Sequence, residues 1–165
     1  MGARLNRFRS KQDYATPEIF IQAVRRYFSI SEFAFDYAAD ATNAKAAVYW
    51  SKQNDSLSKS PVEWAHKTLD GWGWLNPPFS RIGPWAKLCA ESAELGAHIL
   101  LLVPAAVGSN WFRDYVHKRA AVYFLNGRIP FMPDKPMWLY PKDCILAVYS
   151  PLQWRSYEVW NWRQS

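Results

Sequence analysis

Apolar residues along the chain first follow the period of a helix. Residues 19–27 place apolar side chains at helical spacing, and Thr16-Pro17-Glu18 ahead of them is typical of a helix start. We expect Thr16 to be the N-cap and Pro17 to take the first helical position. The spacing predicts a buried face formed by Ile19, Phe20, Ala23, Val24 and Tyr27. Two later helices are predicted from Pro84 to Gly96 and from Asn110 to Val116.

Shorter apolar stretches between these helices predict strands. They cover residues 32–37, 72–75, 98–103, 121–125 and 144–149. The run at 98–103 is continuous, which is typical of a strand buried on both faces. Strands that alternate with helices predict an α/β domain with a mostly parallel sheet. We expect the strand at 144–149 to run antiparallel at an edge, and the Trp-rich tail at 153–165 either to pack on the sheet or to form a nucleic-acid surface.

Composition narrows the class of protein. The chain has 165 residues, 50% of them hydrophobic, which suits one domain with a sizeable core. Its net charge of +6 favours an acidic partner, nucleic acid above all. Residues 1–11 are basic with little to bury and predict a flexible arm ahead of a domain at 12–165, with phosphate contact as the alternative to a solvated tail. No apolar run reaches the ~18 residues of a membrane span, so we expect a cytoplasmic protein.

Neither metal chemistry nor a disulfide framework is indicated. The two cysteines, Cys89 and Cys144, stand alone in apolar stretches, and no Cys-X-X-Cys spacing occurs. We interpret both as reduced core residues, and we expect no metal in the site.

The stretch with the clearest chemistry directly follows the strand at 72–75. In Asn76-Pro77-Pro78-Phe79, two prolines hold the chain stiff and extended. The side-chain oxygen of Asn76 and the carbonyl of Pro77 can then converge as two acceptors, with the ring of Phe79 beside them. This arrangement suits a planar group that carries an NH₂, such as a nucleobase or an amide. A rigid turn with a core phenylalanine is the alternative.

The strand at 32–37 also ends in a polar residue, Asp36. Ligands of open α/β sheets bind at the carboxyl ends of the strands, where an acid commonly holds ribose hydroxyls. Capping of the next turn is the alternative role for Asp36. If this strand lies parallel to the strand at 72–75 and beside it, the two polar ends share one mouth, with one holding a cofactor and the other a substrate. No Gly-X-Gly-X-X-Gly turn is present, which argues against a dinucleotide site.

Seven short segments stand in order between Gln12 and Phe131. They are Tyr14-Ala15-Thr16-Pro17, Phe35-Asp36-Tyr37-Ala38-Ala39-Asp40, Asn43-Ala44-Lys45, Trp74-Leu75-Asn76-Pro77-Pro78-Phe79-Ser80, Leu101-Leu102-Val103-Pro104-Ala105, Trp111-Phe112 and Gly127-Arg128-Ile129-Pro130-Phe131. In this order they resemble the phage-type, Dam-like DNA N-6-adenine methyltransferases. The resemblance implies a Rossmann-like domain, S-adenosylmethionine as cofactor, DNA as partner, and a bacterial host cell as the location of a phage-encoded chain.

The same resemblance implies roles for individual residues. A flipped adenine would meet a catalytic corner made of Asn76, Pro77, Pro78 and Phe79. The cofactor would be bordered by Tyr14, Thr16, Pro17, Asp36, Ala38, Asp40, Asp55 and Asn76. DNA would be contacted by Ser80, Arg81, Trp111, Arg128 and Phe131, the last two being exposed candidates in a proline-rich loop at 127–143 that also contains Lys135 and Trp138.

Two departures from other methyltransferases keep alternatives open. Residues 36–39 stand where many methyltransferases have a glycine-rich turn, and little of the chain is left for a separate target-recognition domain. Specificity would then rest on short loops such as 127–143. A protein glutamine methyltransferase or another amino-methyltransferase suits the same corner, although the former would be expected to show the glycine-rich turn. A non-catalytic nucleic-acid-binding module explains the charge but not the paired acceptors.

Overall fold

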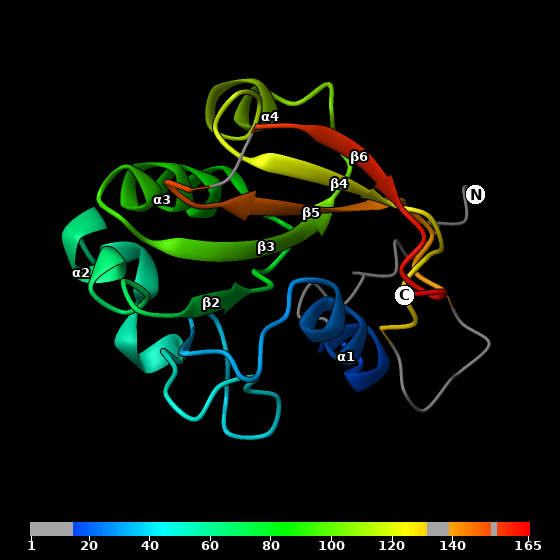
Figure 1. Ribbon diagram of the computed structural model, residues 1–165. Helices are drawn as coiled ribbons and strands as arrows, with labels where there is room; N and C mark the ends of the chain where they lie inside the picture. Colours follow the sequence, from blue (N-terminus) through cyan, green and yellow to red (C-terminus); the bar gives the residue numbers. More distant parts are fainter. Residues whose placement is uncertain (1–14, 132–138, 153–154) are drawn as a thin grey trace, which may run out of the picture.

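A single twisted sheet forms the centre of the protein. The computed structural model describes residues 15–131, 139–152 and 155–165, and within these ranges six strands form one sheet in the order β1-β2-β3-β5-β4-β6 (Figure 1). The strands are β1 (Phe35–Asp36), β2 (Trp72–Leu75), β3 (His98–Pro104), β4 (Ala121–Leu125), β5 (Cys144–Tyr149) and β6 (Tyr157–Trp160).

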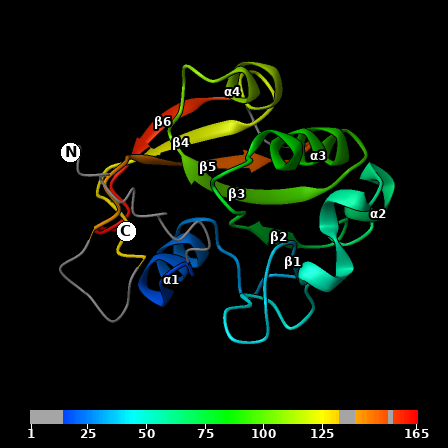
Figure 2. The same cartoon turned by 180° about the vertical axis from the view of Figure 1, so that it is seen from behind.

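Helices cover both faces of this sheet. They are α1 (Glu18–Tyr27), α2 (Pro61–Ala65), α3 (Gly83–Glu94) and α4 (Asn110–Tyr115), with 3₁₀ turns η1 (Lys52–Asn54) and η2 (Ser56–Ser58). Helix α1 lies on one face, and α2, α3 and α4 lie on the other, as two opposite views show (Figures 1 and 2). The result is the three-layer α/β arrangement that the alternation of strands and helices predicts. Within the described ranges, no helix combines the length and the apolar composition that a membrane crossing requires.

The strand directions confirm a mostly parallel sheet and correct one detail of it. Pairs β1–β2, β2–β3 and β4–β6 are parallel, whereas β5 runs antiparallel to both of its neighbours, β3 and β4. The prediction that residues 144–149 run antiparallel is therefore confirmed, but their placement at an edge was wrong. All six residues of β5 are buried, so this strand is stabilised by pairing on both sides. The edge is formed instead by β6, whose Tyr157, Glu158 and Val159 are exposed.

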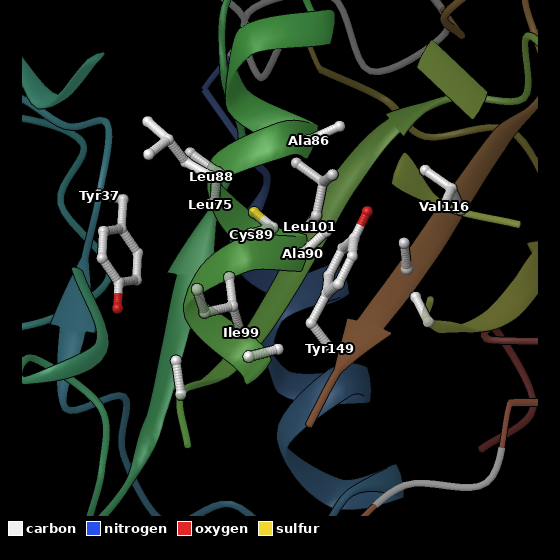
Figure 3. Packing of buried hydrophobic residues seen from close by; sticks show 14 of the residues in the cluster. Tyr37, Leu75, Ala86, Leu88, Cys89, Ala90, Ile99, Leu101, Val116 and Tyr149 are labelled. Carbon is white, nitrogen blue, oxygen red and sulfur yellow. The ribbon is translucent and has the colours of Figure 1, made fainter. Parts of the chain in front are cut away.

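Strand β3 connects the two halves of the core. Its side chains alternate, with Ile99 and Leu101 packed toward α3 and Leu100 and Leu102 packed toward α1. Figure 3 shows the α3 side, where Cys89 of the helix belongs to the same buried cluster as Leu101 and Tyr149. The continuous apolar run thus forms the doubly buried strand that its sequence predicts.

Helix α1 begins one residue later than the sequence indicated. Pro17 is the N-cap residue, and its carbonyl accepts hydrogen bonds from Phe20 N (3.0 Å) and Ile21 N (3.2 Å). The prediction that Thr16 caps this helix was wrong, because the Thr16 hydroxyl bonds elsewhere. The buried face consists of Phe20, Ile21, Ala23 and Val24, whereas Ile19 and Tyr27 are 61% and 42% exposed. Successive helical residues differ by about 100°, so a face centred on Phe20 and Val24 cannot also bury Ile19.

The C-terminal segment packs on the sheet. Strand β6 pairs with β4, and the rings of Trp160 and Trp162 are buried in the same cluster as α1. Of the two interpretations of the Trp-rich tail, packing on the sheet is therefore correct for its described residues. Residues 153 and 154 lie outside the described ranges.

Candidate active site

A cavity opens where the neighbouring parallel strands β1 and β2 end. The register pairs Phe35 with Gly73 and Asp36 with Trp74, so the polar ends of the two strands lie at the same edge of the sheet. The cavity measures about 380 Å³, within the size range of small-molecule sites. Its walls are formed by Ala15, Thr16, Asp36, Ala38, Ala39, Asp40, Asn43, Lys45, Trp50, Ser51, Lys52, Gln53, Asp55, Ser56, Leu57, Trp74, Asn76, Pro78 and Trp85.

Asp36 is the buried acid of this cavity. Its side chain accepts hydrogen bonds from two backbone amides, Ala38 N to Oδ1 (3.1 Å) and Lys45 N to Oδ2 (3.0 Å). The residue is only 2% exposed, and burial raises the pKa of its carboxyl to about 6 although both amides and the Lys45 charge oppose the rise. The backbone bonds hold the carboxylate in one orientation on the cavity wall.

The raised pKa of Asp36 predicts a pH-dependent stability. The folded protein holds this proton more tightly than the unfolded chain, where the pKa is near 3.8. The tighter proton binding by Asp36 therefore stabilises the folded protein fully below pH 3.8. This stabilisation, up to about 3 kcal/mol in the free energy of unfolding, is lost as pH rises through 6. Urea unfolding between pH 4 and 7 should show the wild type losing stability with rising pH relative to Asp36→Asn. The pKa of Asp40 is instead lowered, by hydrogen bonds from Thr42, so Asp40→Asn should shift the curve with the opposite sign.

Two further acids of the site are exposed. The Asp40 carboxylate accepts from the backbone amide (2.7 Å) and the hydroxyl (2.6 Å) of Thr42. Asp55 lies between η1 and η2 in the left-handed region, at φ 47°, a conformation that Asp tolerates better than most residues. Both line the cavity.

The Asn-Pro-Pro corner forms the opposite wall. Strand β2 carries the chain to Asn76, whose Nδ2 donates a hydrogen bond to Thr16 Oγ1 (3.0 Å). Asn76, Thr16 and Pro78 line the cavity, whereas Pro77 is buried and is not part of the wall. The corner thus borders a cleft instead of packed interior, as a binding role requires.

Phe79, the last residue of the corner, does not lie on the cavity wall. Its half-buried ring makes T-shaped contacts with Phe131 (5.9 Å between centroids) and Tyr140 (5.6 Å). The prediction that Phe131 is an exposed DNA contact was wrong, because its side chain is only 2% exposed. The sequence of the proline-rich loop gave no sign that Phe131 would be buried against Phe79.

The remaining predicted site residues are spread more widely. Ser80, Arg81 and Arg128 are exposed, and Trp111 on α4 is half-buried. Arg128 lies near Asp143, with Nε 3.6 Å from Oδ1. These four and Pro17 are not part of the cavity wall. Tyr14, the arm at 1–11, Lys135 and Trp138 lie outside the described residues.

Sequence reasoning missed several residues of the cavity. Lys45 has a side chain only 15% exposed, with Nζ 3.9 Å from Glu18 Oε2. Trp50, Leu57 and Trp85 form an apolar part of the wall. The one signal in the sequence was Lys45, an isolated lysine in an apolar stretch. Trp50 and Trp85 gave no signal, because tryptophans in such a chain usually indicate core.

The cavity combines three kinds of surface. The carboxylates belong to Asp36, Asp40 and Asp55, and the cations belong to Lys45 and Lys52. The apolar part of the wall is formed by Trp50, Leu57 and Trp85. This donor set fits a ligand with hydroxyls, both signs of charge and a flat ring system. In the described part of the chain, no three His, Cys, Asp or Glu side chains are grouped so that they could hold a metal ion.

Comparison with known proteins identifies one family. The family model described as DNA N-6-adenine-methyltransferase (Dam) matches residues 6–139. That range contains every residue of the cavity wall. No curated protein matches the chain.

Proposed function

The chain belongs to the Dam family of DNA N-6-adenine methyltransferases, and from this premise we propose that it transfers the methyl group of S-adenosylmethionine to the exocyclic 6-amino group of an adenine flipped out of DNA. The observation that carries the proposal is the meeting of Asp36 and the Asn76 corner at one cavity. A buried acid for the cofactor and an amide for the amine are then within one site, as the reaction requires.

The cavity wall offers partners for each part of the cofactor. Asp36, with its ionised form favoured above pH 6, would hold ribose hydroxyls or the amino group. Lys45 would face the carboxylate, and Trp50 and Trp85 would contact the purine. When bound, S-adenosylmethionine supplies a methyl group activated by a positively charged sulfur. The protein's own contribution would be to bind and orient the two ligands.

The Asn76 corner would prepare the amine for attack. An aromatic amine is a poor nucleophile because its lone pair is delocalised into the ring. Asn76 Oδ1 and the Pro77 carbonyl would accept its two hydrogens, favour the pyramidal geometry and stabilise the positive charge that develops on nitrogen. Both oxygens are weak bases, so they orient the amine and its proton leaves to water.

The target base must reach this cavity from outside the duplex. Extrusion costs a few kcal/mol of unstacking, and stacking on Phe79 would recover about 1–3 kcal/mol. The net charge of +6 favours binding to the phosphates of DNA. The DNA contacts would be made by Ser80, Arg81, Trp111 and Arg128. We infer one domain at 12–165 whose short loops select the target.

Incubation with labelled S-adenosylmethionine and unmethylated duplex DNA tests the proposal. Nucleoside analysis should find the label in N6-methyladenine. Label in methylcytosine, or in an added protein extract and not in DNA, would contradict it and favour another amino-methyltransferase. DNA binding without any transfer would favour the binding module.

A further inference from the structure

Thr16 makes a side-chain hydrogen bond to the catalytic corner. Its Oγ1 lies 3.0 Å from Asn76 Nδ2, across 60 positions of sequence. The residue is 4% exposed and lies on the cavity wall beside Asn76. The segment before α1 is thereby joined to the loop after β2 at the point where chemistry is proposed.

This hydroxyl has no part in starting the helix that follows. Helix α1 is capped through the carbonyl of Pro17, and no side chain caps its N-terminus. Capping is the usual reason for a threonine ahead of a helix, so the reason for a hydroxyl at position 16 must be sought elsewhere. Its bond to Asn76 supplies one.

The bond to Thr16 goes with one of the two orientations that the Asn76 amide can take. A side-chain amide carries an acceptor oxygen and a donor nitrogen on one carbon, and a half-turn about that bond exchanges them. In the structure the Thr16 hydroxyl accepts from Nδ2, so the nitrogen faces Thr16 and the oxygen lies on the other branch of the amide. The target amine brings only hydrogens to be accepted, so it can use Oδ1 and is repelled by Nδ2.

We propose that Thr16 is a positioning residue for methyl transfer, because its hydroxyl holds the Asn76 amide with the oxygen presented to the target amine. The inference rests on the proposed function and assigns Thr16 a role toward the base in addition to the cofactor. Loss of the hydroxyl would remove one hydrogen bond that holds the amide, so the amide oxygen would be aligned with the amine for less of the time. The defect would therefore appear in the rate of transfer more than in the binding of either ligand.

Two substitutions at this position separate the role from simple packing. Thr16→Val keeps the shape but removes the acceptor, and should lower kcat by about 10- to 100-fold while cofactor affinity and KM for DNA change less than about two-fold. Thr16→Ser keeps the hydroxyl and should recover most of the lost rate. Thr68→Val is the matched control, because Thr68 is also buried and bonds to Tyr37 OH, away from the cavity wall. It should lower the melting temperature without a comparable fall in kcat.

Other results would overturn the inference. An unchanged kcat in Thr16→Val, or a cofactor affinity weakened more than tenfold at unchanged kcat, would assign Thr16 to the cofactor or to packing alone. If kcat fell as far in Thr16→Ser as in Thr16→Val, the hydroxyl would be excluded as the positioning group. If the wild type methylates no adenine, the proposed function itself fails, which is a distinct result.

The bond can also be tested without catalysis. Thr16→Val and Asn76→Ala should each lower the melting temperature, and the double variant should lose less than their sum, because each removes the same bond. Additive losses would overturn the pairing on which the inference depends.

Discussion

Asn76→Ala is expected to abolish methyl transfer while cofactor binding largely survives. The variant loses the amide oxygen proposed to accept from the target amine, and removal of one aligned transition-state partner commonly costs about 10²–10³ in rate. The bond to Thr16 is lost as well, so we expect a loss of about 10³-fold. Transfer of labelled methyl groups to DNA measures the rate, and titration calorimetry with S-adenosylmethionine measures the binding.

The control for this variant is Asn126→Ala, the same change at an exposed position after β4. It should transfer methyl groups at the wild-type rate. Turnover in Asn76→Ala within about threefold of the wild type would contradict the catalytic role. If cofactor affinity fell in proportion to the rate, Asn76 would be assigned to cofactor binding and not to the amine.

Gly73→Ala is expected to have the largest effect on folding. A Cβ at Gly73 in β2 would lie 2.5 Å from Tyr37 Cε2 and 2.8 Å from Thr68 Cγ2. Tyr37 cannot move aside, because it is fully buried, bonds to Trp64 O (2.9 Å) and stacks on the Trp64 ring at 4.3 Å. Overpacking of this kind costs about 1–3 kcal/mol and occasionally more, and we expect the upper end. Urea unfolding followed by circular dichroism measures the change.

Gly108→Ala is the matched substitution for this test. Gly108 has no neighbouring atom within 4 Å of the added carbon and no left-handed φ, so its unfolding free energy should stay within about 0.5 kcal/mol of the wild type. Equal stabilities for the two variants would contradict the packing argument. Gly73 is also paired with Phe35 of β1, so its displacement should disturb the cavity edge and lower cofactor affinity.

The sequence predicted the parts of the site that depend on local chemistry. Asp36 and Asn76 each follow an apolar stretch, and successive parallel strands put such ends at one edge. Their meeting at a cavity confirms that expectation. The doubly buried β3 was predictable for a similar reason, since a continuous apolar run needs cover on both faces.

The rest depends on contacts between distant residues. Nothing local in residues 144–149 distinguishes an antiparallel strand at an edge from one between two neighbours. Trp50 and Trp85 look like core residues until the fold places them on a wall. Thr16 has the pattern of a helix cap, and its actual partner is 60 positions away. Phe131 was expected on the surface because the burying rings, Phe79 and Tyr140, come from elsewhere in the chain.

The interior position of β5 has a consequence for synthesis on the ribosome. Strands β3 and β4 emerge first but share no ladder until residues 144–149 are inserted between them. Until then the nascent chain displays an open, apolar β3 edge, which is the kind of surface that recruits other strands and promotes aggregation. We expect this edge to stay open until residues 144–149 have been synthesised, and fragments that end before Cys144 to be insoluble.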